Sequence, residues 1–150
     1  MPNLTFQGSP DGPLVDVRIS PSSQYQRLAQ FHNRALPPSI QATFLLDTGA
    51  SHCMVDADVI APLGLQPRAT SAIRTATGGR SAAQYDLSLL IHDAAVHNRG
   101  QAWQIDAVPV TGVGQKPFGG APYVGVIGRD VLDRGLLIYN GLAQQIILSW

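Results

Sequence analysis

Residues 44–51 read Phe44-Leu45-Leu46-Asp47-Thr48-Gly49-Ala50-Ser51, an apolar run that ends in a carboxylate and then small residues. Such a run is typical of a strand, and Asp, Thr and Gly are typical of the turn that follows one. Taken alone, an Asp-Thr-Gly tripeptide is compatible with an ordinary turn. The window therefore predicts a strand that delivers Asp47 into a tight loop, and other parts of the sequence must decide whether this carboxylate is functional.

The rest of the chain is divided into short segments by 15 glycines and 11 prolines spread along its 150 residues. Few windows are long enough for a helix, and several have the composition of strands. Asn140-Gly141 marks a turn between the last two of these. We predict an all-β fold with strands within residues 14–19, 42–46, 87–91, 104–110, 136–139 and 145–150.

Short helices are predicted near two acidic residues. Asp56 can cap a helix over residues 57–63 that stops before Gly64. Asp130 can open a single helical turn that ends at Gly135.

Residues 22–36 carry apolar side chains at helical spacing before Pro37-Pro38, so this stretch is compatible with either a helix or a loop. No repeat, low-complexity tract or linker divides the chain. We therefore expect a single domain over residues 1–150.

A second informative window is Tyr123-Val124-Gly125-Val126-Ile127-Gly128-Arg129-Asp130-Val131-Leu132. On its own it indicates a buried strand that enters a helix. Together, apolar-apolar-Asp-Thr-Gly-Ala-Ser and, about 80 residues later, apolar-apolar-Gly-Arg-Asp resemble the retropepsin branch of the aspartic peptidases. The resemblance extends over roughly residues 40–150. It implies a closed acid-protease β-barrel subunit with a flap hairpin and one or two short helices.

The resemblance also implies roles for the residues of the first window. Asp47 would be the catalytic carboxylate, the Thr48 hydroxyl would reach across to the loop of a partner subunit, and Gly49 would lie against the substrate backbone. Ala50 and Ser51 would contribute to substrate binding.

Residues of the second window would support this loop from below. Val126 and Ile127 would pack beneath it, and Gly128 would leave room for its close approach. Arg129 would form a hydrogen bond nearby. Many retroviral members carry an acidic residue at the position of Ser51 and pair the arginine with it, so Arg129 must find another partner here.

Residues 73–82 contain Gly78-Gly79 and are typical of a hairpin tip with a glycine turn. Retropepsins carry their flap at this place, the arm that closes over substrate and excludes water, and a plain surface hairpin is the alternative. As a flap, the segment would bring Thr77, Gly78 and Gly79 to the substrate. Phe118, in the loop before the second window, would line a side-chain pocket or belong to the core.

The implied chemistry needs two neighbouring carboxylates, because the pair shares one proton, so that one member acts as a base and the other as an acid. The base removes a proton from the attacking water, and small neighbours leave room for the second carboxylate and the substrate. The 150 residues contain one Asp-Thr-Gly, so a second copy must supply the other aspartate. We therefore predict a homodimeric aspartic endopeptidase acting on peptides or proteins, with no metal or cofactor. A non-catalytic peptide-binding or dimerisation module of the same fold is the alternative.

Other sequence features support fewer conclusions. The four histidines lack the spacing of a metal site, although His52 could border a substrate pocket, and Cys53 is better explained as a buried structural thiol than as a nucleophile. Ten basic and ten acidic residues indicate no nucleic-acid partner, and no run reaches the roughly 18 apolar residues of a membrane span. The first residues do not resemble a secretory signal, so we expect a cytoplasmic protein.

We also expect the hairpin within residues 136–150 to be covered by its copy in an intersubunit sheet.

Overall fold

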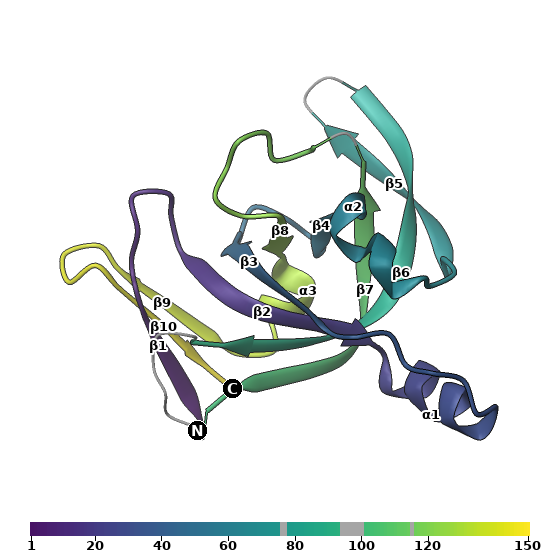
Figure 1. Cartoon of the computed structure of the whole chain (residues 1–150). Helices are drawn as coiled ribbons and strands as arrows, with labels where there is room; N and C mark the ends of the chain where they lie inside the picture. The colour runs from purple at the N-terminus through teal and green to yellow at the C-terminus, as the bar shows by residue number, and fades with distance from the viewer. Residues whose placement is uncertain (76–77, 94–100, 115) are drawn as a thin grey trace.

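The computed structural model describes residues 1–75, 78–93, 101–114 and 116–150, and it is dominated by β-strands (Figure 1). The strands are β1 Asn3–Gln7, β2 Leu14–Pro21, β3 Ile40–Leu46, β4 Met54–Asp56, β5 Ala69–Thr75, β6 Gly78–His92, β7 Trp103–Val113, β8 Gly125–Ile127, β9 Leu136–Asn140 and β10 Gln145–Ser149. The short helices are α1 Ser23–Phe31, α2 Ala57–Ile60, the 3-10 turn η1 Ala61–Leu63, and α3 Arg129–Leu132. Every strand expected from the sequence is present, whereas β1 and β4 were not anticipated. No described helix is long and apolar enough to cross a membrane.

The larger sheet closes on itself. Its strands follow the order β2-β3-β8-β4-β7-β6, and a further antiparallel pairing of β2 with β6 completes the ring. β5 continues the sheet beyond the ring by pairing with β6, and the β5–β6 hairpin projects from one end of the barrel (Figure 1). The predicted closed β-barrel is therefore confirmed.

Alternating side chains fill the barrel. In β2, Val15, Val17 and Ile19 are buried while the residues between them are half-buried or exposed. This period of two places one face of the strand inside. Leu89 of β6 and Val110 of β7 are also fully buried. Each such side chain contributes about 1.5–3 kcal/mol when it is fully removed from water, and together they fix the strand register.

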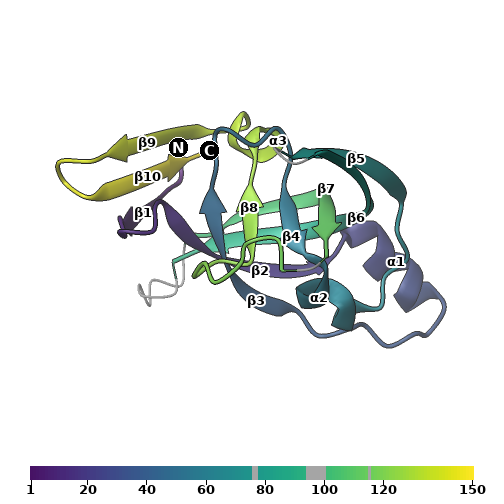
Figure 2. The same ribbon diagram turned by 90° about the horizontal axis from the view of Figure 1, so that it is seen from above.

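A smaller sheet in the order β1-β10-β9 lies beside the barrel and contains both chain ends (Figure 2). Ile146 and Leu148 of β10 are fully buried, and the indoles of Trp103 and Trp150 stack with centroids 5.5 Å apart. Within the single chain, β1 already covers one edge of the final strand, because it pairs along β10 from Asn3–Ser149 to Gln7–Gln145. The outer strands of this sheet are β1 and β9. The predicted intersubunit sheet therefore remains a prediction that concerns the other edge of this hairpin.

The structure resolves the ambiguous stretch before Pro37 as helix α1. Its first turn is capped by the Ser22 hydroxyl, which accepts a hydrogen bond from the Tyr25 N–H. The backbone N–H and hydroxyl of Ser23 both donate to the Asp106 carboxylate on β7. Partial burial raises the pKa of Asp106, but these hydrogen bonds lower it by more, so it lies below its ordinary value. This link attaches the start of α1 to the barrel, while the rest of the helix projects outward (Figure 1).

The two predicted short helices are present with small differences. Asp56 caps α2 by accepting from the Asp58 N–H, and the helix tightens into η1 around Pro62 before ending at left-handed Gly64. The second helix, α3, begins one residue earlier than expected. Gly128 occupies its N-cap position and Asp130 lies inside the first turn.

Candidate active site

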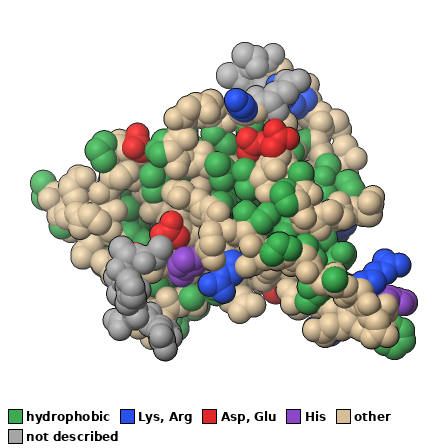
Figure 3. All heavy atoms as spheres, in the orientation of Figure 1, with side chains coloured by type: hydrophobic (Ala, Val, Ile, Leu, Met, Phe, Trp, Pro, Cys, Tyr) green, Lys and Arg blue, Asp and Glu red, His purple; other side chains and the backbone are tan. Residues whose placement is uncertain are grey.

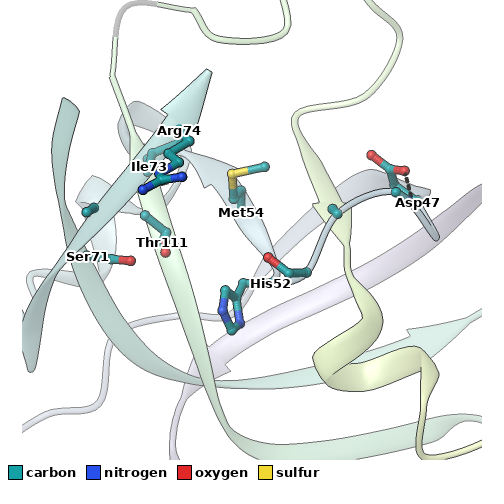
Figure 4. A pocket seen from close by; sticks show the side chains of 11 residues that line it. Asp47, His52, Met54, Ser71, Ile73, Arg74 and Thr111 are labelled. Carbon is teal, nitrogen blue, oxygen red and sulfur yellow. Dashed lines mark hydrogen bonds between the residues drawn. The ribbon is translucent and has the colours of Figure 1, made fainter. Parts of the chain in front are cut away.

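Asp47 lies immediately after β3, in a loop held from two sides. β3 pairs in parallel with β8, and the Asp47 N–H donates to the Ile127 carbonyl oxygen at 3.0 Å. The Asp47 carboxylate turns back to accept the Gly49 N–H at 2.8 Å, shown as a dashed line in Figure 4. The backbone carbonyl oxygen of Asp47 accepts a hydrogen bond from the Ala50 N–H at 3.2 Å. The tight Asp-Thr-Gly turn predicted from the sequence therefore orients this half-buried carboxylate through backbone groups.

The second motif packs against this loop. Val126 pairs with Leu45 in the parallel ladder, and α3 begins directly after β8. The Arg129 N–H donates to the Ala50 carbonyl at 2.9 Å. Its guanidinium donates through Nη1 to the Thr48 carbonyl at 2.7 Å. The Arg129 side chain therefore binds a backbone oxygen. The acidic side chain with which this arginine pairs in many retroviral members is absent here, because Ser51 occupies its position.

Gly128 passes very close to the far end of the loop. A Cβ atom at this position would lie 2.6 Å from the carbonyl carbon of His52 and 2.8 Å from its nitrogen. Real Cβ atoms essentially never approach backbone that closely. The glycine is therefore required by the close packing of the two motifs.

Cys53 and Asp130 form a contact that the sequence analysis missed. The Asp130 carboxylate accepts the Cys53 N–H through Oδ2 and the thiol through Oδ1, each at 3.1 Å. Burial raises the pKa of the Cys53 thiol far above its ordinary range, and the negative charge of Asp130 raises it further. Cys53 is fully buried, so it is a protonated structural thiol and not a nucleophile. Nothing in the spacing of the two residues indicates this contact, because it depends on how the two motifs pack.

A cavity of about 520 Å³ opens beside Asp47 (Figure 4). The loop side of its wall includes Asp47, Gly49, Ala50 and Ser51, which the sequence analysis had assigned to the site. The wall is completed by His52, Met54, Ser71, Ala72, Ile73, Arg74 and Thr111. Residues from the loop, β4, β5 and β7 thus meet around one space. Ile73 and Arg74 belong to the predicted flap hairpin, whereas Ser71, Ala72 and Thr111 had no predicted role.

Several residues that were predicted to contact substrate do not line this cavity. Gly78 and Gly79 do not line the cavity and do not form a turn, because they begin β6 and pair with Thr75 and Arg74. Thr77 lies outside the described residues. Phe118 is half-buried and packs against Tyr123 at 5.4 Å between ring centroids, away from the cavity wall. Thr48, which was predicted to reach the loop of a partner subunit, is exposed.

The described residues contain no group of three or more His, Cys, Asp or Glu side chains arranged to bind a metal. The chemistry available at the cavity is instead that of one accessible carboxylate, oriented by its own turn and surrounded by small residues. A carboxylate of this kind can accept a proton from water or donate one, provided that a second acid shares its proton.

A closed β-barrel that presents an Asp-Thr-Gly loop beside a cavity defines the aspartic protease class. The sequence profile of a family described as aspartyl protease matches residues 39–131, more than half of the chain. This chain belongs to the aspartyl protease family. Among solved structures, a retropepsin-like aspartic protease from Rickettsia conorii is similar, with 17% identity, a TM-score of 0.62, and coverage of 99% of this chain and 90% of that chain. At this identity the likeness shows a retropepsin-like fold. No curated protein sequence matches this chain significantly.

Proposed function

We propose that this chain is one subunit of a homodimeric aspartic endopeptidase that cleaves peptide bonds with water. The observation that carries the proposal is Asp47 at the edge of the cavity, with its carboxylate held by the Gly49 N–H. In this mechanism, one aspartate of the dyad takes a proton from a bound water as the water attacks the substrate carbonyl. The other aspartate stabilises the developing oxyanion and then helps to protonate the leaving amine.

The second aspartate would come from another copy of the chain. The sequence contains a single Asp-Thr-Gly, and a two-fold contact is the simplest way to bring an aspartate beside its own copy. Two carboxylates that lie side by side hold one proton between them. Activity should therefore be highest at acidic pH, where this singly protonated state is populated. Thr48 is exposed, and in this arrangement its hydroxyl would contact the partner loop.

The β5–β6 hairpin would act as the flap of this enzyme. Ser71, Ile73 and Arg74 of β5 line the cavity, so movement of the hairpin would change how well the cavity is closed. Closure over a bound peptide would exclude bulk water and strengthen the electrostatic interactions of the dyad.

Replacement of Asp47 by Asn tests the proposed chemistry. The amide is nearly isosteric and can still accept the Gly49 N–H, but it cannot act as a general base, so peptide hydrolysis should fall by at least about a thousandfold. The measurement is turnover of a fluorogenic peptide library by the purified variant and wild type across pH 3–8, with circular dichroism and light scattering to check fold and assembly. Asp11→Asn is the matched control, because Asp11 is exposed in the β1–β2 connection, and it should retain wild-type turnover.

Turnover by Asp47→Asn above a few per cent of wild type would refute the assignment of Asp47. A wild-type chain that binds peptides without cutting any of them would instead identify the non-catalytic peptide-binding module.

A further inference from the structure

The charges around the cavity are asymmetric. Its wall carries one acidic side chain, Asp47, and two side chains that can be positive, Arg74 and His52. Arginine keeps its charge at every pH at which the protein is folded, and an imidazole can donate a hydrogen bond from a ring N–H. Figure 4 shows Arg74 and His52 on separate walls, with Asp47 at the far end of the cavity from Arg74.

Neither positive side chain has an anionic partner within the described residues. The one ion pair recorded there joins Arg68 to Asp86, away from the cavity. Arg74 and His52 also form no side-chain hydrogen bond with another described residue. Their donors are therefore available to a bound molecule.

The surroundings of Arg74 keep it accessible. Arg74 pairs across the hairpin with Gly79, which has no side chain to cover it. Its neighbours on the wall supply hydroxyl groups, from Ser71 and Thr111, and apolar surface, from Met54 and Ile73. Such a wall offers apolar contact to the methylene groups of a side chain and hydrogen-bond donors to its end.

We infer that this cavity selects substrates with an acidic side chain, glutamate or aspartate, near the scissile bond, and that Arg74 is the main specificity-determining residue. The inference rests on the proposed function. An acidic side chain that reaches Arg74 remains far from Asp47, so the negative charge of the dyad does not oppose it strongly (Figure 4). A planar guanidinium binds carboxylate through two parallel N–H donors, which an uncharged amide cannot match equally well. His52 adds a second donor from the opposite wall.

Matched peptide pairs test the inference. Peptides identified by library cleavage are synthesised with Glu or Gln, and Asp or Asn, at each position flanking the cut bond, and kcat/KM is measured for each pair. Wild type should prefer the acidic member of the best pair by about tenfold, as expected for a charged hydrogen bond in a partly open site. Arg74→Gln should reduce that preference to within about twofold, and His52→Gln should reduce it partly.

Two controls separate recognition of charge from general effects on the hairpin. Arg80→Gln removes an equal charge from β6 but not from the cavity wall, so the preference for the acidic peptide should persist. Raising the salt concentration from 50 to 500 mM should weaken the preference of wild type and leave that of Arg74→Gln unchanged, because salt screens exposed charge pairs.

Equal kcat/KM for acidic and amide peptides in wild type would overturn the inference, as would an Arg74→Gln variant that loses activity equally toward both. If no peptide is cleaved, the proposed function fails, but the inference is still decided by binding. Fluorescence anisotropy of labelled peptides from the uncut library, each made with Glu and with Gln at one position, on the Asp47→Asn protein should then give about tenfold tighter binding of the acidic member. Equal affinities would reject the acidic pocket.

Discussion

Gly128 packs closely against the backbone that follows the Asp47 loop. The backbone of His52 passes within 3 Å of the position that a Cβ atom would occupy on this residue. Its φ of −90° is accessible to any amino acid, so the requirement for glycine is one of space and not of backbone conformation. This contact does not tolerate an added methyl group, because neither side of it is a side chain that could move away.

Gly128→Ala should therefore destabilise the protein by about 2–3 kcal/mol and displace the Asp47 loop, because backbone must shift to admit the methyl group. Chemical denaturation gives the change in unfolding free energy, and peptide turnover reports on the loop. Gly120→Ala is the control, since a Cβ there has no neighbour within 4 Å. Its effect on stability should be within about 0.5 kcal/mol. A Gly128→Ala protein as stable as the control would show that the two motifs can separate freely.

Because Cys53 is buried, we expect the protein to lose stability as the pH rises into the alkaline range. Burial, reinforced by Asp130, holds the pKa of the thiol above its value in the unfolded chain, about 8.5. The native protein therefore keeps a proton that the unfolded chain releases. The resulting stabilisation is fully present below about pH 8.5 and is lost as pH rises above it.

Wild type should accordingly lose about 1.4 kcal/mol of stability per pH unit above roughly pH 8.5 relative to Cys53→Val, which has no thiol to titrate. Urea unfolding of both proteins between pH 7 and 10 measures this difference, and other titrating groups cancel in the comparison. Parallel pH profiles would mean that the thiol ionises equally well in the native state.

The β5–β6 hairpin is the element whose sequence reading needed the largest revision. Glycines at 78 and 79 suggested the turn itself, but they form the start of β6. Gly78 has a φ of +134°, a conformation that side-chain-bearing residues rarely adopt, whereas the φ of Gly79 is ordinary. The two glycines are therefore not equivalent.

Gly78→Ala should lower kcat/KM by about tenfold with little loss of global stability, because it strains the arm that is proposed to close over substrate and not the barrel. Gly79→Ala should remain within about twofold of wild type, since its new Cβ would meet its nearest neighbour, the Ile73 carbonyl oxygen, at 3.6 Å. Peptide kinetics and thermal melting of the two variants test this contrast. Equal kinetics for both would show that the conformation of Gly78 is unimportant for turnover.

At the level of the assembly, we expect the outer strand β9 to contact a second copy of the chain. Leu136 is 52% exposed, Ile138 44% and Tyr139 56%, and Leu142 is fully exposed in the turn beyond them. Hydrophobic side chains are visible at the outer end of this hairpin (Figure 3). An apolar edge strand has unpaired N–H and C=O groups that can form hydrogen bonds with a strand of another chain. β9 also begins four residues after α3, which is bonded to the Asp47 loop, so a contact along β9 would involve the part of the molecule that carries the site.

Ile138→Lys should therefore yield inactive monomer, because it places a charge in the proposed contact without touching the barrel core. Analytical ultracentrifugation and peptide turnover are the measurements, and wild-type specific activity should itself fall on dilution through the dissociation constant of the dimer. Phe31→Lys is the control, since Phe31 is 81% exposed on the projecting helix α1. A fully active monomer would overturn the shared dyad, and an active dimer of Ile138→Lys would move the interface elsewhere.

Local pattern alone was sufficient for much of the structure. The alternation in residues 14–19, the apolar run before Asp47 and the turn at Asn140-Gly141 each predict an element that the fold contains. The same is true of the cap at Asp56. These features are readable because strand alternation, turn chemistry and helix capping depend on neighbours along the chain. The pairing of two separated motifs also identified the aspartic protease family.

The tertiary structure decided everything that depends on distant partners. β1 exists because it pairs with β10 at the other end of the chain, and the barrel closes because β2 meets β6. The contact between Cys53 and Asp130, and the approach of Arg74 to the Asp47 cavity, have the same origin. A strand sequence specifies which face is apolar but not which edge will bind it, and the energy of a pairing depends on side chains that only the complete fold brings together. The sequence could therefore locate Asp47, whereas the wall that would recognise its substrate is assembled only when the strands close.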